Sequence, residues 1–194
     1  MENLVQKTAT TSYPIMTELA ERWSPRAFDK VYELSEQELG SMLEAARWAP
    51  SSNNTQPWQF VVAKRGTPLF DQIRETLAGF NQVWTPWASA LIVNVVELAN
   101  EEGKVLRHGL YDLGQAAAHL SIQAAHLGLH VHQMSGFDAE ALHGVLGLEE
   151  RFSPSVMMAV GKIGEPEMLP EGPRERELLE RTRKPLSEVA PGTF

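Results

Sequence analysis

Cysteine is absent from the 194-residue sequence. Without a thiol, the chain can contain no disulfide, no cysteine nucleophile, no iron–sulfur cluster and no cysteine-ligated zinc ion. Positive charge is scarce as well: 17 Lys and Arg residues stand against 25 Asp and Glu residues, which gives a formal net charge of −8. Neither a general nucleic-acid surface nor an anionic-membrane surface is therefore expected.

Long apolar segments are also missing. A membrane-spanning helix needs about 20 predominantly apolar residues, and the longest apolar run, residues 88–96, contains Ser89 and Asn94. The first residues include neither a basic nor an apolar segment, so no signal peptide is predicted. The expected location is the cytoplasm, which suits the absence of cysteine.

Motifs of several common enzyme classes are absent too. The nearest approach to a dinucleotide-binding glycine fingerprint is Gly161-x-x-Gly164, which runs into Pro166 instead of a helix. The sequence contains no Walker loop, no His-Glu-x-x-His motif and no Gly-x-Ser-x-Gly elbow. A catalytic nucleophile supplied by the protein is therefore not supported.

The hydrophobic pattern predicts a single α+β domain over residues 1–194. Helices are expected over residues 14–23, 35–48, 67–78, 106–127, 138–147 and 175–183, and strands over 58–63, 90–96, 130–134 and 155–160. Ser35 and Glu38 form a capping box, and the apolar spacing in 106–127 indicates a central helix. Residues 1–14 are expected to be a loose extension, and the proline-rich residues 165–194 an arm with little core.

Polar and basic groups are concentrated in three segments. Residues 49–60 (APSSNNTQPWQF) are either a cap and turn cluster or, as we favour, a loop whose amides and hydroxyls hold a heteroaromatic ligand. Pro25 lies between Arg22 and Arg26, so the two arginines could converge with Ser24 on a phosphate. Residues 181–184 form a further basic cluster. For both basic segments, the alternative is a set of solvated charges.

The tryptophans and histidines each allow two interpretations. Trp84 and Trp87 either pack in the core or form a lid that stacks on a ligand. His130 and His132 share a strand face and could line a metal site with His126. No carboxylate has matching spacing, so we favour half-buried strand residues and predict no metal.

Taken in order along the chain, these segments resemble the FMN-dependent nitroreductase family, over about residues 15–190. The matching residues are Arg22-x-Ser24-x-Arg26-x-Phe28, Ala49-Pro50-Ser51-Ser52-x-Asn54-x-Gln56-Pro57-Trp58-x-Phe60, Tyr111-Asp112-Leu113-Gly114-x-Ala116, Leu127-Gly128-Leu129, Gly136-Phe137-Asp138, Val160-Gly161-x-x-Gly164 and Arg183-Lys184-Pro185-Leu186. The resemblance implies a mostly antiparallel sheet between helices, with a C-terminal arm exchanged in an obligate homodimer. Two FMN sites would lie at the dimer interface.

The resemblance also implies roles for individual residues. The FMN phosphate and ribityl chain would be held by Arg22, Ser24, Arg26, Arg183 and Arg181. The other subunit would contribute Pro50, Ser51, Ser52, Asn54 and Gln56. Asn81 would bind the flavin pyrimidine edge, and Ser135 and Gly136 would approach the flavin N5. The substrate side would be lined by Trp84 and Trp87.

Two positions depart from the family pattern. Trp84 falls where some members carry a lysine near the flavin N1 and O2 atoms, and Ser135 falls where some members carry a glutamate beside N5. Neither departure predicts one substrate.

The implied activity is ping-pong hydride transfer from NADH or NADPH, through the flavin, to nitroaromatic, quinone or similar small-molecule acceptors. A second hypothesis keeps the fold and FMN but changes the reaction to dehalogenation, enoate reduction or flavin breakdown. The lid loop around residues 97–108 would discriminate between these reactions. A third hypothesis is a flavin-binding dimer without enzymatic function.

Overall fold

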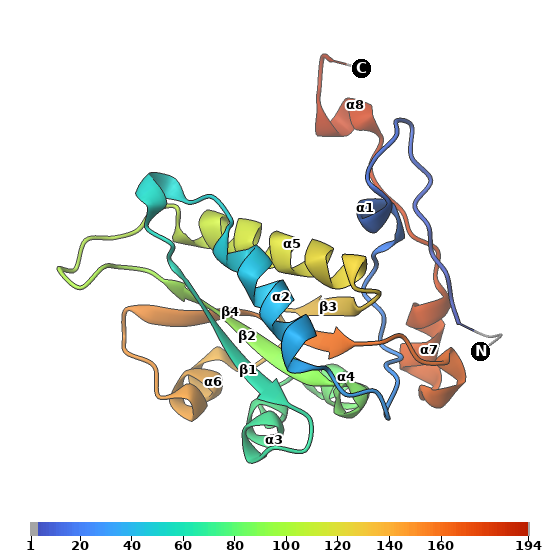
Figure 1. Ribbon diagram of the computed structural model, residues 1–194, viewed down its shortest axis with the longest axis horizontal. Helices are drawn as coiled ribbons and strands as arrows, with labels where there is room; N and C mark the ends of the chain where they lie inside the picture. The colour runs from blue at the N-terminus through green and yellow to red at the C-terminus, as the bar shows by residue number, and fades with distance from the viewer. Residues whose placement is uncertain (1–3, 194) are drawn as a thin grey trace.

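A central antiparallel sheet organises the chain (Figure 1). The computed structural model describes residues 4–193, and within them four strands pair in the order β1-β2-β4-β3. The strands are β1 (Trp58–Lys64), β2 (Ala90–Glu97), β3 (His130–Met134) and β4 (Phe152–Gly161). The α+β class and the antiparallel sheet predicted from the sequence are confirmed.

Strand β2 is the centre of the core because it is buried along almost its whole length. Its alternate residues point to opposite faces of the sheet, as the period of two requires. Leu91 and Val93 belong to one apolar cluster, whereas Ala90 and Ile92 belong to the other. Asn94 interrupts the apolar run at a register shift, and neither polar atom of its buried side chain has a hydrogen-bond partner.

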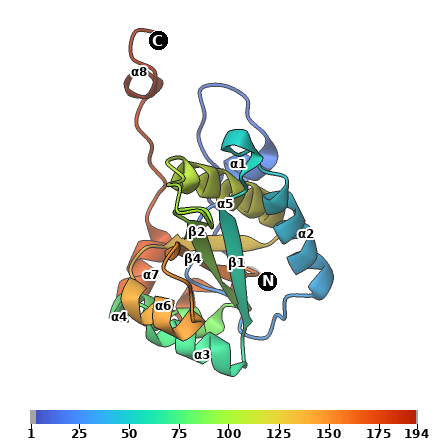
Figure 2. The same cartoon turned by 90° about the vertical axis from the view of Figure 1, so that its left-hand side faces the viewer.

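Helices cover both faces of the sheet (Figure 2). On one face lie α2 (Glu36–Arg47) and α5 (Gly109–His126), and on the other lie α3 (Pro68–Glu75) and α6 (Ala139–Leu146). Shorter helices are α1 (Thr17–Glu21), α4 (Gly79–Gln82), α7 (Glu171–Leu178) and α8 (Leu186–Val189). Three 3-10 turns are η1 (Ser52–Asn54), η2 (Thr85–Trp87) and η3 (Pro166–Met168). No helix within residues 4–193 is long and apolar enough to cross a membrane.

Local capping signals fixed the helix ends that the sequence predicted best. The Ser35 hydroxyl accepts from the Glu38 backbone N–H while the Glu38 carboxylate accepts from the Ser35 N–H, so the capping box is confirmed. Asp138 caps α6, and Gly147 ends it in the left-handed conformation at φ 60°. Gly128 follows α5 at φ 70°, as expected of a C-terminal cap.

Other boundaries differ from the prediction because of contacts distant in sequence. Helix α5 begins at Gly109 instead of 106, since the Leu106 N–H donates to the Leu98 carbonyl in a hairpin over residues 98–106. A Cβ on Gly109 would lie 2.9 Å from the Glu97 carbonyl oxygen, so the start of α5 packs closely against the end of β2. Helix α7 (Glu171–Leu178) begins four residues before the predicted span 175–183 and ends five residues before the end of that span.

The two ends of the chain lie side by side. Lys7 donates to the Leu179 carbonyl, and Arg181 donates to the carbonyls of Lys7 and Ala20. Residues 4–14 contain no helix or strand, yet these bonds tie them to the C-terminal arm. Beyond Arg181 the arm leaves the body of the molecule and carries α8 outward (Figures 1 and 2).

Candidate functional site

The predicted basic residues from both ends of the sequence line one pocket of about 200 Å³. Its lining residues are Lys7, Arg22, Trp23, Ser24, Arg26, Arg176, Arg181 and Arg183. All five residues that the sequence assigned to a phosphate are therefore brought together. Lys7 and Arg176 were missed: Lys7 lies in a polar segment without a motif, and Arg176 lies in a charged run that looks solvated.

The backbone of residues 25–27 in this pocket is fixed by buried partners. The carboxylate of Glu177, which has no exposed surface, accepts from the Arg26 N–H at 2.8 Å and from the Ala27 N–H at 3.1 Å. The Nδ1 of His132 donates to the Pro25 carbonyl at 2.8 Å. Burial, with a smaller effect of the Arg26 charge, lowers the pKa of His132 to about 4, so its ring is neutral near pH 7.

Positive charge in the pocket exceeds the negative charge around it. No carboxylate is among the described residues that line it. Burial, followed by the charges of Arg181 and Arg183, lowers the pKa of Arg22. The Nε of Arg26 is buried without a hydrogen-bond partner. An orphaned buried donor among crowded guanidinium groups is the environment that an anion such as phosphate would complete.

The two C-terminal arginines differ in how far their donors are occupied. One guanidinium nitrogen of Arg181 binds two backbone carbonyls, so this side chain ties the arm to the N-terminal segment. Among residues 4–193, Arg183 bonds only to the neighbouring Thr182 carbonyl. Arg183 is therefore the freer of the two for a ligand.

Asn81, Ser135 and Gly136 lie next to this pocket. The Gly136 carbonyl accepts from the Ala78 N–H at 2.8 Å and from the Asn81 side chain at 3.5 Å. A Cβ on Gly136 would lie 3.3 Å from the Asn81 amide nitrogen, so the backbone at Ser135 and Gly136 approaches α4 closely. Phe80 joins the two regions: its ring centre is 5.8 Å from the Arg26 guanidinium carbon and 4.7 Å from that of Arg176.

The loop over residues 50–56 lies elsewhere, at the first turns of α5 (Figure 1). The Ser52 N–H donates to the buried Asp112 carboxylate at 3.0 Å. Arg22, by contrast, lines a pocket with His126 at the last turn of α5. At 1.5 Å per residue, the helix separates Asp112 from His126 by about 21 Å. One chain therefore brings the arginines and Asn81 together but not the loop.

Three residues of this loop have left-handed backbone conformations that are uncommon outside glycine. Asn53, Asn54 and Gln56 have φ angles of 52°, 55° and 50°. The Ser51 hydroxyl accepts from the Gln56 N–H, which compensates part of the cost. Such conformations cost of the order of 1–3 kcal/mol each and cluster at ligand-binding sites.

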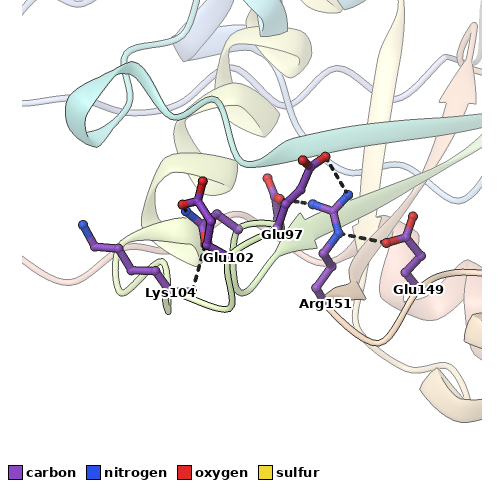
Figure 3. Close-up of polar contacts among 7 residues, drawn as sticks. Glu97, Glu102, Lys104, Glu149 and Arg151 are labelled. Carbon is purple, nitrogen blue, oxygen red and sulfur yellow. Dashed lines mark hydrogen bonds and ion pairs between the residues drawn. The ribbon is translucent and has the colours of Figure 1, made fainter.

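A pocket of about 790 Å³ separates this loop from the hairpin over residues 98–106. Its lining residues are Ser52, Asn53, Thr55, Glu97, Asn100, Lys104, Val105, Leu106, Arg107, His108, Gly109 and Asp112. Figure 3 shows how the base of the hairpin is held: Arg151 pairs with Glu97 and with Glu149, the latter at 2.9 Å. The predicted lid segment 97–108 is thus a hairpin with a charged anchor.

The two tryptophans predicted to contact substrate lie in or against the core. Trp84 has no exposed surface, stacks on Phe28 with ring centres 6.2 Å apart, and lies 4.6 Å from the His132 ring centre. Direct contact with a ligand was therefore a wrong prediction for Trp84, and core packing is correct. Trp87 is half-buried against the same cluster, and its substrate role stays a prediction.

The three histidines considered as metal ligands have separate partners. His126 pairs with Glu18, His132 bonds to the Pro25 carbonyl, and His130 meets the Trp23 ring edge-on. Across the part of the chain that the structure describes, no group of three or more His, Asp or Glu side chains could hold a metal ion.

Comparison with known proteins agrees with this geometry. A sequence model described as the nitroreductase family matches residues 19–108 and 98–162, which together are most of the chain. The chain belongs to the nitroreductase family. This nitroreductase-family chain is 26% identical over 218 residues to the oxygen-insensitive NAD(P)H nitroreductase of Salmonella typhimurium, with 90% of this chain and 99% of that protein covered.

Solved structures share the fold of this chain. A crystal structure of an oxidoreductase containing FMN is 33% identical to this nitroreductase-family chain, with a TM-score of 0.89. The alignment covers 95% of this chain and 94% of that one. A nitroreductase-family protein from Clostridium difficile, at 22% identity and a TM-score of 0.71, shares the fold, with 93% of this chain and 99% of that one covered.

Proposed function

We propose that this protein is an FMN-dependent oxidoreductase that takes reducing equivalents from NADH or NADPH. The acceptor would be a nitroaromatic, a quinone or a similar small molecule, reduced by a ping-pong mechanism. The observation that carries the proposal is the basic pocket, where buried Arg26 Nε has no partner and no described carboxylate lines the wall. Relatives named NAD(P)H nitroreductase and a similar structure containing FMN support it.

The residues of the pocket fit the phosphate of FMN. Arg22, Arg26 and Arg183 supply guanidinium donors and Ser24 a hydroxyl, which suits a dianion. Arg181 holds the arm in place beside them. Phe80 lies against the Arg26 guanidinium of this pocket and is followed in the chain by Asn81. The Asn81 side-chain amide can bind the polar edge of a heteroaromatic ring.

When bound, FMN supplies hydride acceptance and hydride release. The chain itself would bind and orient the flavin and shield it from water. The backbone at Ser135 and Gly136 offers N–H groups next to Asn81, and a Cβ at position 136 would press on the Asn81 amide at 3.3 Å. The charged hairpin beside the 790 Å³ pocket is placed to limit water and to select the acceptor.

A second copy of the chain would complete the site. The loop over residues 50–56 lies about 21 Å along α5 from the basic pocket, so the two cannot meet within one chain. A symmetric dimer joins such separated patches twice. Exposed apolar side chains on α5 and on the arm suit such an interface, and they include Leu110, Tyr111, Leu178, Leu179 and Val189. The proposed location of this dimer is the cytoplasm.

A spectroscopic experiment tests the proposal. The purified protein is titrated with FMN and then with NADPH or NADH without oxygen. We expect a bound-flavin visible spectrum that bleaches with at least one donor and recovers when a quinone or nitroaromatic is added. Protein that takes up no FMN would overturn the proposal. Protein whose bound FMN is not bleached by either donor would reduce it to flavin binding alone.

A further inference from the structure

Helix α7 docks on the body through a carboxylate instead of an apolar stripe. Only Pro173 and Glu177 are buried in this helix. Fully buried glutamates are rare because moving a carboxylate out of water costs several kcal/mol. The position of Glu177 therefore needs specific compensating contacts, and a helix with this composition would otherwise be solvated.

The contacts of Glu177 are with backbone groups 150 residues away. Its two oxygens accept separately from the adjacent N–H groups of Arg26 and Ala27. The Arg26 guanidinium lies at 3.8 Å, an ion pair longer than a hydrogen bond. The carboxylate thus holds the peptide groups of the basic segment more closely than it holds the arginine charge.

Other contacts fix the same stretch from the opposite side. The Pro25 carbonyl accepts from His132, and the Ala27 carbonyl accepts from the Gly164 N–H at 2.8 Å. Together with Glu177 on the two N–H groups, these bonds occupy four backbone polar groups between Pro25 and Ala27. The direction in which the Arg26 side chain leaves the backbone is thereby set, and its Nε stays without a partner in the pocket.

We propose that Glu177 is a positioning residue for the phosphate of the cofactor: by holding the Arg26 and Ala27 N–H groups, it presents the Arg22–Arg26 segment to that phosphate. The inference rests on the proposed FMN-dependent function. It also makes phosphate binding depend on the docked state of the C-terminal arm, because Glu177 belongs to the arm and its partners do not.

A purely electrostatic role for Glu177 predicts the opposite result. Burial raises its pKa, and the N–H groups and the charges of Arg26 and Lys7 oppose that rise. If this carboxylate only reduced the positive charge of the pocket, its removal would strengthen phosphate binding. If it positions the segment, its removal weakens phosphate binding although the pocket becomes more positive.

The test compares FMN with riboflavin, which has the same ring and ribityl chain but no phosphate. In Glu177→Gln we expect the Kd for FMN to rise about tenfold, the effect of losing one hydrogen bond to a charged group, while the Kd for riboflavin is unchanged. Glu177→Asp keeps the charge but shortens the reach, so it should weaken FMN binding in the same way. Glu175→Gln, on the exposed side of α7, is the matched control and should bind as the wild type does.

Tighter FMN binding by Glu177→Gln, or wild-type binding by Glu177→Asp, would overturn the inference. Equal losses for FMN and riboflavin would also overturn it, since they indicate general damage. Hydrogen exchange on the wild-type protein serves where the variants do not fold: the Arg26 and Ala27 amides should be strongly protected, and exchange at unprotected rates contradicts the proposal. Failure of wild-type protein to bind FMN would instead refute the proposed function.

Discussion

The basic pocket and the loop over residues 50–56 are two halves of one proposed site, but they are built in different ways. The pocket joins segments about 150 residues apart and depends on buried partners such as Glu177 and His132. The loop is joined to α5 by the Ser52–Asp112 bond, but its three left-handed residues lie on the surface, and the bond at Gln56 comes from its near neighbour Ser51. The geometry of the pocket therefore depends on residues elsewhere in the fold, whereas the backbone strain of the loop is local to residues 53–56.

The largest expected effect is a loss of unfolding free energy on acidification, which arises at His132 beside the basic pocket. Burial lowers the folded pKa of His132 to about 4, whereas an unfolded histidine titrates near 6.5. A lowered folded pKa means that the stabilisation is complete above pH 6.5 and is lost as the pH falls from about 6.5 to 4. The loss should approach about 3 kcal/mol of unfolding free energy.

Denaturant unfolding of the apoprotein at several pH values measures this loss. His132→Gln should show a flatter profile over the same range, and the exposed His108→Gln should follow the wild type. If the unfolding free energy of the wild type depends on pH as weakly as that of His132→Gln, then His132 is not the source of the loss.

Substitution of the pocket arginines should have the next largest effect. Arg22→Ala and Arg183→Ala should each weaken FMN binding by about 1.5–3 kcal/mol, because each removes a charge-assisted hydrogen bond to phosphate. Arg181→Ala should lower stability more than affinity, since its guanidinium holds two backbone carbonyls. Calorimetric titration with FMN measures the affinities, and Arg174→Ala on the exposed face of α7 is the control. Unchanged titrations for both Arg22→Ala and Arg183→Ala would refute this placement of the phosphate.

The strain of the loop should produce the smallest effect. Gln56→Gly should be more stable than Gln56→Ala by about 1 kcal/mol, because glycine adopts a positive φ without the Cβ penalty that alanine keeps. Both variants lose the polar side chain, so the difference isolates the backbone. Urea unfolding of the two proteins measures it, and equal midpoints would show that position 56 stores no strain.

Sequence rules predicted what depends on neighbouring residues. The Ser35–Glu38 capping box, the Asp138 cap and the strand over residues 90–96 all follow from local pattern, and all are present. The clustering of Arg22 with Arg183 required the family resemblance, since nothing local links the two ends of the chain.

Contacts distant in sequence decided the rest. Glu177 looks like one more charge in a solvated run, and only the fold reveals that it meets the backbone at Arg26. For Trp84 the sequence allowed both core packing and a ligand lid, and only the fold shows that Phe28 and His132 enclose it. The start of α5 moved to Gly109 because the preceding residues form a hairpin.

The length of α5 also has a genetic consequence. If each site takes its arginines from one chain and its loop from the other, a mixed dimer of an Arg22 variant and a Gln56 variant places both lesions in the same site. The second site then contains neither lesion. Two alleles that are each defective alone would therefore complement one another when expressed together, whereas two alleles altered in the same half would not.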